Sequence, residues 1–266
     1  MSDSSVKKIT PWTIVKYILV YLASLLFISP FIMMIIKSLE NGGLDNYTKV
    51  FETSQLGYNF ISSTVITACT VFLVLLVTLP AAFAFSKLKL RGSSALYYFI
   101  MSAMMMPPAV SLVPLLMLVK NMGLLDNYFS VIFPFVALFI PFAVLITRNS
   151  MDDLPNEILE AAYIDGASTF QSFMLIIVPL SRATILVTIT FTFMNAWNEY
   201  LYPLCFLRSS ELQTVTVVPM RFLGSYYGNI PQVFAAGNMI LLPVVILYLF
   251  LQKYFEAGFV NGAIKG

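Results

Sequence analysis

Six long apolar segments alternate with polar stretches along the chain. Each is close to the ~20 residues that a helix needs to cross the hydrocarbon core of a bilayer. The segments cover residues 14–36, 63–85, 95–119, 129–147, 183–207 and 233–251. Several contain proline, which a membrane bundle tolerates because neighbouring groups satisfy the freed carbonyls, and which we expect to kink the helix. The pattern predicts an all-α integral membrane fold with six transmembrane helices, in a single domain over residues 1–266.

The composition supports a membrane protein and excludes several other classes. Of 266 residues, 59% are hydrophobic and 11% are charged, whereas a typical soluble domain has about 25% charged residues. The net charge of +2 is small and no basic cluster with interleaved aromatics occurs, so we expect a lipid bilayer and no nucleic acid as a partner. There is no histidine, and the two cysteines lie within apolar segments, so we expect no metal site.

Lysine and arginine are distributed unevenly between the two sides of the predicted bundle. Six spans place both termini on the same side of the membrane. Most of the fifteen lysine and arginine residues lie on that side, including Lys87, Arg91, Arg148 and Arg182. The positive-inside rule assigns that side to the cytoplasm. The chain is therefore predicted to be a multi-pass protein of the cytoplasmic membrane with both termini in the cytoplasm.

Residues 148–182 form the longest predicted cytoplasmic segment and carry signals for two short helices. Asp152 and Asp153 precede Pro155, and acidic residues with an early proline favour the start of a helix. We expect this first helix to run through residues 156–163.

A turn and a second helix are expected in the other half of the same segment. Gly166 permits a turn because it lacks a Cβ atom. Ser168 and Gln171 have the spacing of a capping box, which starts a helix, and Pro179 is expected to end that helix. From these residues alone, the segment is either a surface that fits a groove on a partner or a solvated amphipathic loop.

Three stretches of the chain resemble one family. The string EAAYIDGASTFQSFMLIIVPL, residues 160–180, resembles the EAA loop of the transmembrane permease subunits of ABC importers, and in particular their carbohydrate (maltose-type) branch. The strings WNEYLYPLCFL (197–207) and LQKYFEAGFVNGAIKG (251–266) are similar to the fifth-helix signature and the ending of that family. The chain departs from the family pattern at Val178, usually leucine, and at Ala183, often proline.

The resemblance implies a permease subunit that translocates a sugar (an oligosaccharide, monosaccharide or related polyol) by alternating access. It also implies a second homologous permease subunit, two ATPase subunits and an extracytoplasmic solute-binding protein as partners. The loop over residues 148–182, called the coupling loop below, would dock on an ATPase subunit. The residues that the resemblance assigns to this docking are Glu160, Ala161, Ala162, Asp165, Gly166, Ala167, Phe173 and Pro179.

No phosphate-binding motif of the form G-x-x-x-x-G-K-[ST] occurs in the chain. We therefore expect a transport subunit with no enzymatic activity, no catalytic residues and no bound cofactor. ATP and Mg²⁺ would be used by the partner ATPase subunits.

Polar residues recur every three or four positions in the segment 183–207 and define one helical stripe, with Trp197 on the opposite face. A polar stripe is unfavourable against lipid, so we expect it to face the bundle interior or a partner subunit. The carboxylate of Glu199 would either accept hydrogen bonds from sugar hydroxyls or brace the outer gate. The alternative for the stripe is a hydrogen-bonded packing seam. The candidate translocation residues are Thr188, Thr192, Asn195, Asn198, Glu199 and Tyr202.

Three other functions remain as alternatives. An ABC permease for a non-sugar solute would have the same motifs. An ion-coupled secondary transporter ordinarily has carboxylates near the midplane, often in repeated halves, whereas the spans here contain essentially Glu199 and show no convincing repeat. A membrane-embedded enzyme needs a catalytic constellation, but the carboxylates of this chain cluster in the coupling loop.

Overall fold

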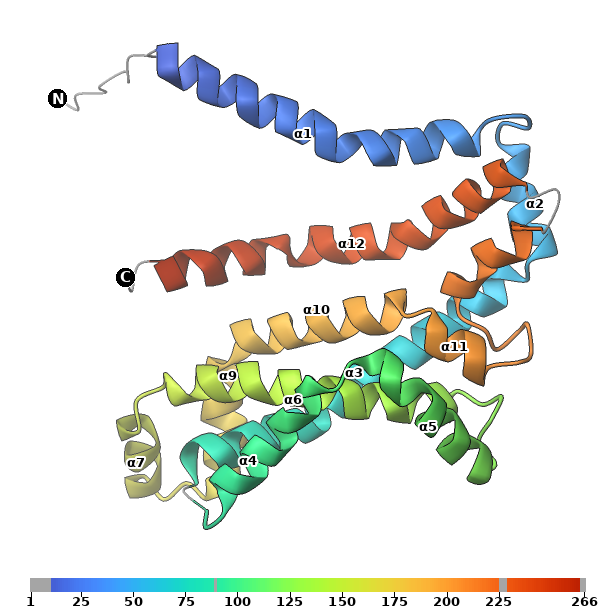
Figure 1. Cartoon of the computed structure of the whole chain (residues 1–266). Coiled ribbons are helices and arrows are strands. Elements are labelled where there is room, and N and C mark those ends of the chain that lie inside the picture. The colour runs from blue at the N-terminus through green and yellow to red at the C-terminus, as the bar shows by residue number, and fades with distance from the viewer. Residues whose placement is uncertain (1–10, 89, 225–228, 264–266) are drawn as a thin grey trace. The chain divides into compact units, whose positions relative to one another are not determined.

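A computed structural model describes residues 11–88, 90–224 and 229–263, with side chains up to Phe250. Within these ranges every regular element is a helix (Figure 1). The chain divides into two compact units. The first comprises the chain to Glu52 together with Pro219–Met239, and the second comprises Thr53–Val218 and the chain from Ile240. The family-like ending at residues 251–266 lies outside the described side chains.

The first unit contains α1 (Pro11–Ser38), α2 (Asp45–Thr53) and the beginning of α12 (Ile230–Ala263). Its polar contacts lie around the turn between α1 and α2, where Asn46 Nδ2 donates hydrogen bonds to the carbonyls of Ser38 at 2.9 Å and Glu40 at 3.0 Å. Asn238 Nδ2 of α12 donates to Tyr47 Oη at 3.0 Å. Within α1, whose residues are all described, Ser38 alone is buried, so almost the whole apolar helix is available to lipid or to another chain.

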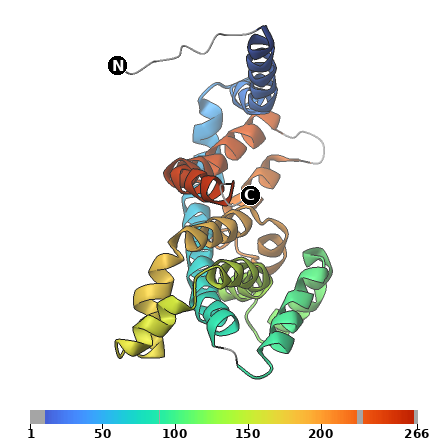
Figure 2. The same cartoon turned by 90° about the vertical axis from the view of Figure 1, so that its left-hand side faces the viewer.

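The second unit is built around α3, α6 and α10, which pack against one another (Figure 2). Its core joins residues from α3, α6, α10 and α11, among them Ile66, Phe135, Ala196 and Phe206. The elements of this unit are α3 (Leu56–Lys87), α4 (Ser93–Ser102), η1 (Ala103–Met105), α5 (Pro108–Asn121), α6 (Phe129–Asp152), α7 (Glu157–Ile164), α8 (Thr169–Ser172), the π-helix η2 (Phe173–Ile177), α9 (Val178–Leu180), α10 (Arg182–Asn198), α11 (Leu201–Phe206) and the first half of the 3₁₀-helix η3 (Val215–Phe222).

The predicted all-α membrane fold is confirmed. Among the described residues, four helices are long and apolar enough to cross a membrane: α1, α3, α6 and the Ile230–Phe250 part of α12. Two bent pairs raise the number to six if each pair is one span. They are Ser93–Met105 with Pro108–Asn121, bent by 101°, and Thr169–Leu180 with Arg182–Asn198, bent by 76°.

The four predicted helices that remain unbroken are longer than the apolar segments that indicated them, as α3 and α6 illustrate. α3 begins at Leu56, before residue 63, and α6 runs to Asp152, beyond residue 147. Hydropathy marks the part of a helix that lies in lipid, and polar turns can extend the helix at either end. The first turns of α3 and the last turn of α6 are such extensions.

The predicted span over residues 183–207, where proline was expected to kink the helix, consists of two helices. α10 ends at Asn198, Glu199 is extended with φ −68° and ψ 132°, and α11 begins at Leu201. Pro203 has no N–H, so it cannot donate the hydrogen bond to the carbonyl of Glu199 that a continuous helix requires. That carbonyl instead accepts a hydrogen bond from Thr216 Oγ1 at 2.8 Å.

The third predicted span is also interrupted, at the place where prolines were expected to kink it. Pro107 is extended, with φ −60° and ψ 132°, and Pro108 opens α5. Proline is well accommodated at the start of a helix, where its missing N–H would have no partner within the helix. The two prolines therefore separate α4 from α5.

Candidate functional site

The first short helix of the coupling loop lies where it was expected, since α7 covers Glu157–Ile164 and the prediction was 156–163. The acidic pair does not start it, because α6 continues to Asp152. Arg148 lies four residues before Asp152, and its Nε is 3.4 Å from Asp152 Oδ2. Opposite charges at this spacing stabilise a helix by a few tenths of a kcal/mol, so the pair contributes to the continuation of α6.

The turn between the two short helices matches the prediction. Gly166 has φ +83°, and the backbone N–H of Ala167 donates to the carbonyl of Ala162 at 2.9 Å. A Cβ atom at Gly166 would meet nothing within 4 Å. Glycine is therefore required for the left-handed backbone conformation and not for lack of space.

The predicted capping box at the start of the second short helix is confirmed. The backbone N–H of Gln171 donates to Ser168 Oγ at 3.3 Å, and the backbone N–H of Ser168 donates to Gln171 Oε1 at 2.8 Å. Each side chain thus satisfies a backbone donor of the other residue. Together with the turn at Gly166, this fixes the angle between α7 and α8 by local contacts.

The second short helix ends later than expected. Pro179 lies within α9, and the chain bends after Leu180. The preceding residues Phe173–Ile177 form a π-helix. Its wider turn shifts the hydrogen-bond pattern, so that the missing N–H of Pro179 does not end the helix.

One face of the coupling loop is exposed and mixes acidic, small and apolar residues. Glu160, Ala161, Asp165 and Gly166 are exposed, and Ala167 is half-buried. Ile164 is 85% exposed and Phe170 is 70% exposed. Sequence reasoning did not single out these two apolar residues, although a large apolar residue in a polar helix is a recognised sign of an interaction surface.

The other face of the loop is packed against the bundle. Ala162 and Phe173 are buried, so these two predicted docking residues face inward. The rings of Phe83 and Phe173 have centroids 5.1 Å apart, and Leu159 and Ile177 join the same apolar cluster. The loop therefore moves with α3 and α6. Figure 1 shows α7 lying across the ends of the longer helices of this unit.

The threonines of the polar stripe lie in a seam between α10 and α6. Thr188 and Thr192 are fully buried. Thr188 Oγ1 is 3.4 Å from Thr147 Oγ1, and Thr184 Oγ1 donates to Ser150 Oγ at 2.6 Å. Thr184 and Thr188 thus belong to a hydrogen-bonded packing seam, whereas the buried Thr192 Oγ1 has no hydrogen-bond partner among the described residues.

The remaining candidate residues lie in different surroundings. Asn195 and Asn198 are exposed on α10, and their amides donate to carbonyls within that helix at 2.7 and 2.8 Å. Tyr202 is buried, and its Oη donates to the carbonyl of Pro108 at 2.9 Å and lies 2.9 Å from Ser111 Oγ. The six candidate translocation residues therefore do not form one site within this chain.

The carboxylate of Glu199 caps α11. Its Oε1 accepts hydrogen bonds from the backbone N–H groups of Tyr200 at 3.1 Å and Leu201 at 2.9 Å. A side-chain oxygen that satisfies the free donors at the start of a helix stabilises that helix. The geometry favours bracing of the helix break over binding of a sugar hydroxyl.

This role predicts the effects of two substitutions. We expect Glu199→Gln to retain uptake within about twofold, because the amide oxygen can accept the same hydrogen bonds, and Glu199→Leu to lower uptake about tenfold through loss of the cap. Uptake assays over a range of substrate concentrations would check both. A selective rise in KM for Glu199→Gln would instead identify the carboxylate as a substrate ligand.

Asp126 organises the far end of the same unit and was missed by sequence reasoning. It lies between α5 and α6 with φ +60°. Its Oδ1 accepts hydrogen bonds from the backbone N–H groups of Arg208 and Ser209, each at 2.8 Å, and its Oδ2 accepts one from the Ser209 hydroxyl. These contacts secure residues 207–214, which we call the α11–η3 loop. The partners are far apart in sequence, so no local pattern indicates them.

The hydrogen bonds to Asp126 predict a pH dependence. The Ser209 side chain, then the Ser209 and Arg208 backbone donors, lower the pKa of Asp126 below its ordinary value of 3.8. Because the pKa is lower in the folded state, the stabilisation is complete above pH 3.8 and is lost as the pH falls through the folded-state pKa. We expect hydrogen exchange of the Arg208 and Ser209 amides to be unchanged between pH 7 and 5, after correction for intrinsic rates, and faster below the folded-state pKa. Asp126→Asn should remove this dependence.

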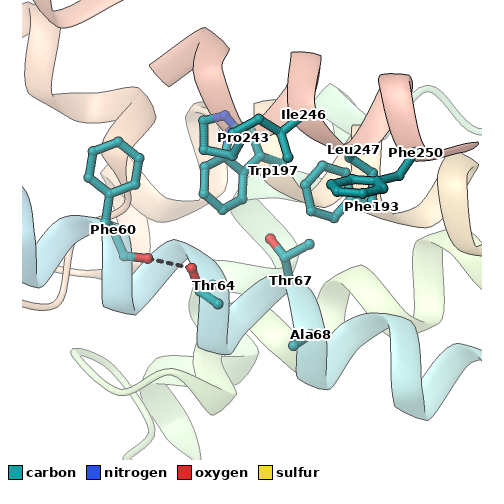
Figure 3. A pocket seen from close by; sticks show the side chains of 10 residues that line it. All are labelled: Phe60, Thr64, Thr67, Ala68, Phe193, Trp197, Pro243, Ile246, Leu247 and Phe250. Carbon is teal, nitrogen blue, oxygen red and sulfur yellow. Dashed lines mark hydrogen bonds between the residues drawn. The ribbon is translucent and has the colours of Figure 1, made fainter. Parts of the chain in front are cut away.

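A cavity of about 390 Å³ lies between α3, α10 and α12 (Figure 3). Aromatic and aliphatic side chains line most of it, and Phe193 stacks on Trp197 with ring centroids 5.5 Å apart. Thr64 Oγ1 already donates to the carbonyl of Phe60 at 2.8 Å. With few polar groups, this cavity suits an apolar group and not a sugar, which needs several hydrogen-bond partners.

The fold and the loop define a class of protein: a helical membrane subunit with a capped two-helix projection at one end. Residues 79–261 match a model of one family, the binding-protein-dependent transport system inner membrane component. The chain belongs to this family, which confirms the predicted resemblance to ABC importer permeases.

Relatives named for the sugars of their transport systems align with most of the chain. It is 32% identical over 222 residues to the melibiose/raffinose/stachyose import permease protein MelC of Bacillus subtilis, covering 83% of this chain and 80% of that protein. It is 30% identical over 262 residues to the trehalose/maltose transport system permease protein MalG of Thermococcus litoralis, covering 92% and 94%. Its fold is similar to a chain of a bacterial ABC transporter involved in alginate import, with a TM-score of 0.82 and 22% identity over 94% of this chain and 98% of that chain.

Proposed function

We propose that this chain is the permease subunit of an ATP-driven ABC importer and that it translocates a sugar across the cytoplasmic membrane by alternating access. The observation that carries the proposal is the coupling loop, whose exposed face is held at a fixed angle by Gly166 and the Ser168–Gln171 capping box. A rigid projection of this kind can transmit force from a partner. The relatives that import melibiose, raffinose, stachyose, trehalose and maltose support an oligosaccharide as the substrate.

The exposed face of the loop is suited to docking on an ATPase subunit. Glu160 and Asp165 favour a groove with basic residues, and Ile164 and Phe170 can bury apolar surface in it. Ala161 permits close approach because its side chain is small. ATP and Mg²⁺ would be used by two such ATPase subunits, and this chain would supply the mechanical link to the membrane.

The other partners follow from the same proposal. A second, homologous permease subunit would cover apolar faces that are exposed in this chain, and a solute-binding protein would deliver the sugar from the extracytoplasmic side. Lys87, Arg148 and Arg182 lie at the coupling-loop end of the second unit. With the positive-inside rule, they support a cytoplasmic location for that end and for both termini.

Reconstitution with the two ATPase subunits, the second permease and the binding protein tests the proposal. We expect uptake of a labelled oligosaccharide and ATP hydrolysis that the loaded binding protein stimulates and vanadate inhibits. Proton- or sodium-dependent uptake by this chain alone would establish a secondary transporter instead. Stimulation by a non-sugar solute only would establish the other kind of ABC permease.

A further inference from the structure

The helix α3 has polar attachments at both of its ends. It is continuous over 32 residues, about 48 Å at 1.5 Å per residue, which exceeds the ~30 Å hydrocarbon core of a bilayer. Pro80 lies inside it without breaking it. The helix is therefore long enough for both ends to extend beyond the hydrocarbon core, one on each side.

The end at Lys87 is attached to the coupling loop. Lys87 Nζ donates to the carbonyl of Leu154 at 2.6 Å and to Asn156 Oδ1 at 3.1 Å, the residue that precedes α7. One turn earlier, Phe83 packs against Phe173. Hydrogen bonds from a charged donor and a buried aromatic contact thus hold both short helices of the loop to α3.

The end at Asn59 is attached to the α11–η3 loop. Asn59 is fully buried, and its Nδ2 donates to the carbonyls of Ser210 and Gln213, each at 2.7 Å. Ser62 Oγ donates to the carbonyl of Glu211 at 2.9 Å. Asn59 and Ser62, on one turn of α3, therefore bind backbone carbonyls of this loop. These contacts do not depend on the side chains of the loop.

The part of α3 between these ends is firmly packed. Ile66, Thr70, Val74 and Thr78 recur every fourth residue and are fully buried, and α3 packs chiefly against α6. Tightly packed helices move as units because their interfaces do not deform continuously. A displacement of one end of α3 is therefore passed to the other.

We propose that α3 links the coupling loop to the α11–η3 loop, with Lys87 and Asn59 as the positioning residues at its two ends. This proposal rests on the proposed function, in which the coupling loop receives the movement of an ATPase subunit. Closure of the ATPase subunits would then displace the α11–η3 loop through movement of α3 as a unit. No series of side-chain rearrangements across the membrane would be needed.

The first test compares Lys87→Met with Arg91→Met in the reconstituted importer. Arg91 is exposed and lies four residues further along, so its replacement removes the same charge without the attachment. A hydrogen bond from a charged donor corresponds to about a tenfold change in a conformational equilibrium. We expect Lys87→Met to lower the stimulation of ATP hydrolysis by the binding protein about tenfold with basal hydrolysis retained, and Arg91→Met to lower it less than twofold.

The second test measures the far end of the helix. Glu211 is exposed, so Glu211→Cys in a Cys69→Ser, Cys205→Ala background reports on the α11–η3 loop through its rate of thiol labelling. We expect vanadate trapping to change this rate severalfold in the otherwise unchanged protein, and Lys87→Met to abolish the change. An unaltered response in the Lys87 variant would overturn the proposal.

A double variant separates transmission from simple destabilisation. Lys87 and Asn59 are about 42 Å apart along α3, and substitutions so far apart are ordinarily additive. Asn59→Asp places a carboxylate against two carbonyls and should uncouple the outer end. We expect Lys87→Met to have almost no further effect on stimulation in that background, whereas full additivity would contradict the link.

The controls also separate this proposal from the proposed function. If the unsubstituted complex shows no stimulation with any sugar-loaded binding protein, the proposed function fails. If it is stimulated and the Lys87 variant behaves identically at equal membrane level, only the role of α3 fails. Lys87→Gln, which keeps a shorter donor, gives a second measurement if Lys87→Met does not assemble.

Discussion

Replacement of Gly166 by valine is expected to reduce uptake to background while the subunit still inserts and assembles. At φ +83°, a left-handed conformation costs a residue with a Cβ atom about 1–2 kcal/mol, and β-branched residues tolerate it least. The space around the position is open, so valine would not clash but would shift the backbone. The angle between α7 and α8 would change, and with it the fit to the proposed ATPase partner.

Two matched variants isolate the conformational cause. Asparagine tolerates the left-handed region better than other residues with side chains, so Gly166→Asn should retain a substantial fraction of uptake. Gly57 lies in α3 with nothing near its Cβ position and with no positive φ, so Gly57→Val should be nearly neutral. Wild-type uptake by Gly166→Val would show that the coupling loop does not need this turn.

Phe173→Ala is expected to detach the coupling loop from the bundle. Phe173 is 8% exposed and packs on Phe83, and loss of a buried phenylalanine costs about 3–5 kcal/mol. We expect faster proteolysis between α6 and α8, a lower melting temperature in detergent, and loss of binding-protein-stimulated ATP hydrolysis. Phe173→Leu should have a smaller effect because it retains most of the apolar volume.

Phe170 provides the control on the same segment. It lies three residues earlier and is 70% exposed, so Phe170→Ala should leave the melting temperature and the proteolysis pattern unchanged. If both alanine variants have the same stability as the parent, the contact of Phe173 with α3 does not hold the loop.

The coupling loop could be read from the sequence because its contacts are local. The turn at Gly166 depends on one backbone conformation, and the capping box joins residues three positions apart. Helical periodicity also placed the threonines of α10 on one face. It could not show that this face packs against α6 of the same chain and not against a substrate, because that depends on contacts about forty residues away in sequence.

The other differences between the prediction and the structure also arise from contacts between residues far apart in sequence. The break at Glu199 depends on Thr216, and the fold of the α11–η3 loop depends on Asp126, more than eighty residues earlier. Ala162 was expected to be part of the docking surface, but it is buried. Leu159 turns α7 toward a cluster of residues from α3, α6 and η2, and the periodicity of eight residues cannot indicate these partners. Local chemistry was therefore predictable from the sequence, and the choice of long-range partners was not.

The break between α10 and α11 has a consequence for motion. A helix that bends in its interior loses backbone hydrogen bonds, but here the donors of α11 are bound by the Glu199 carboxylate, the carbonyl of Glu199 is bound by Thr216, and Pro203 has no donor to lose. The two helices can therefore change their mutual angle with all of these bonds intact. A change of angle at this joint during a transport cycle would therefore break none of these backbone hydrogen bonds.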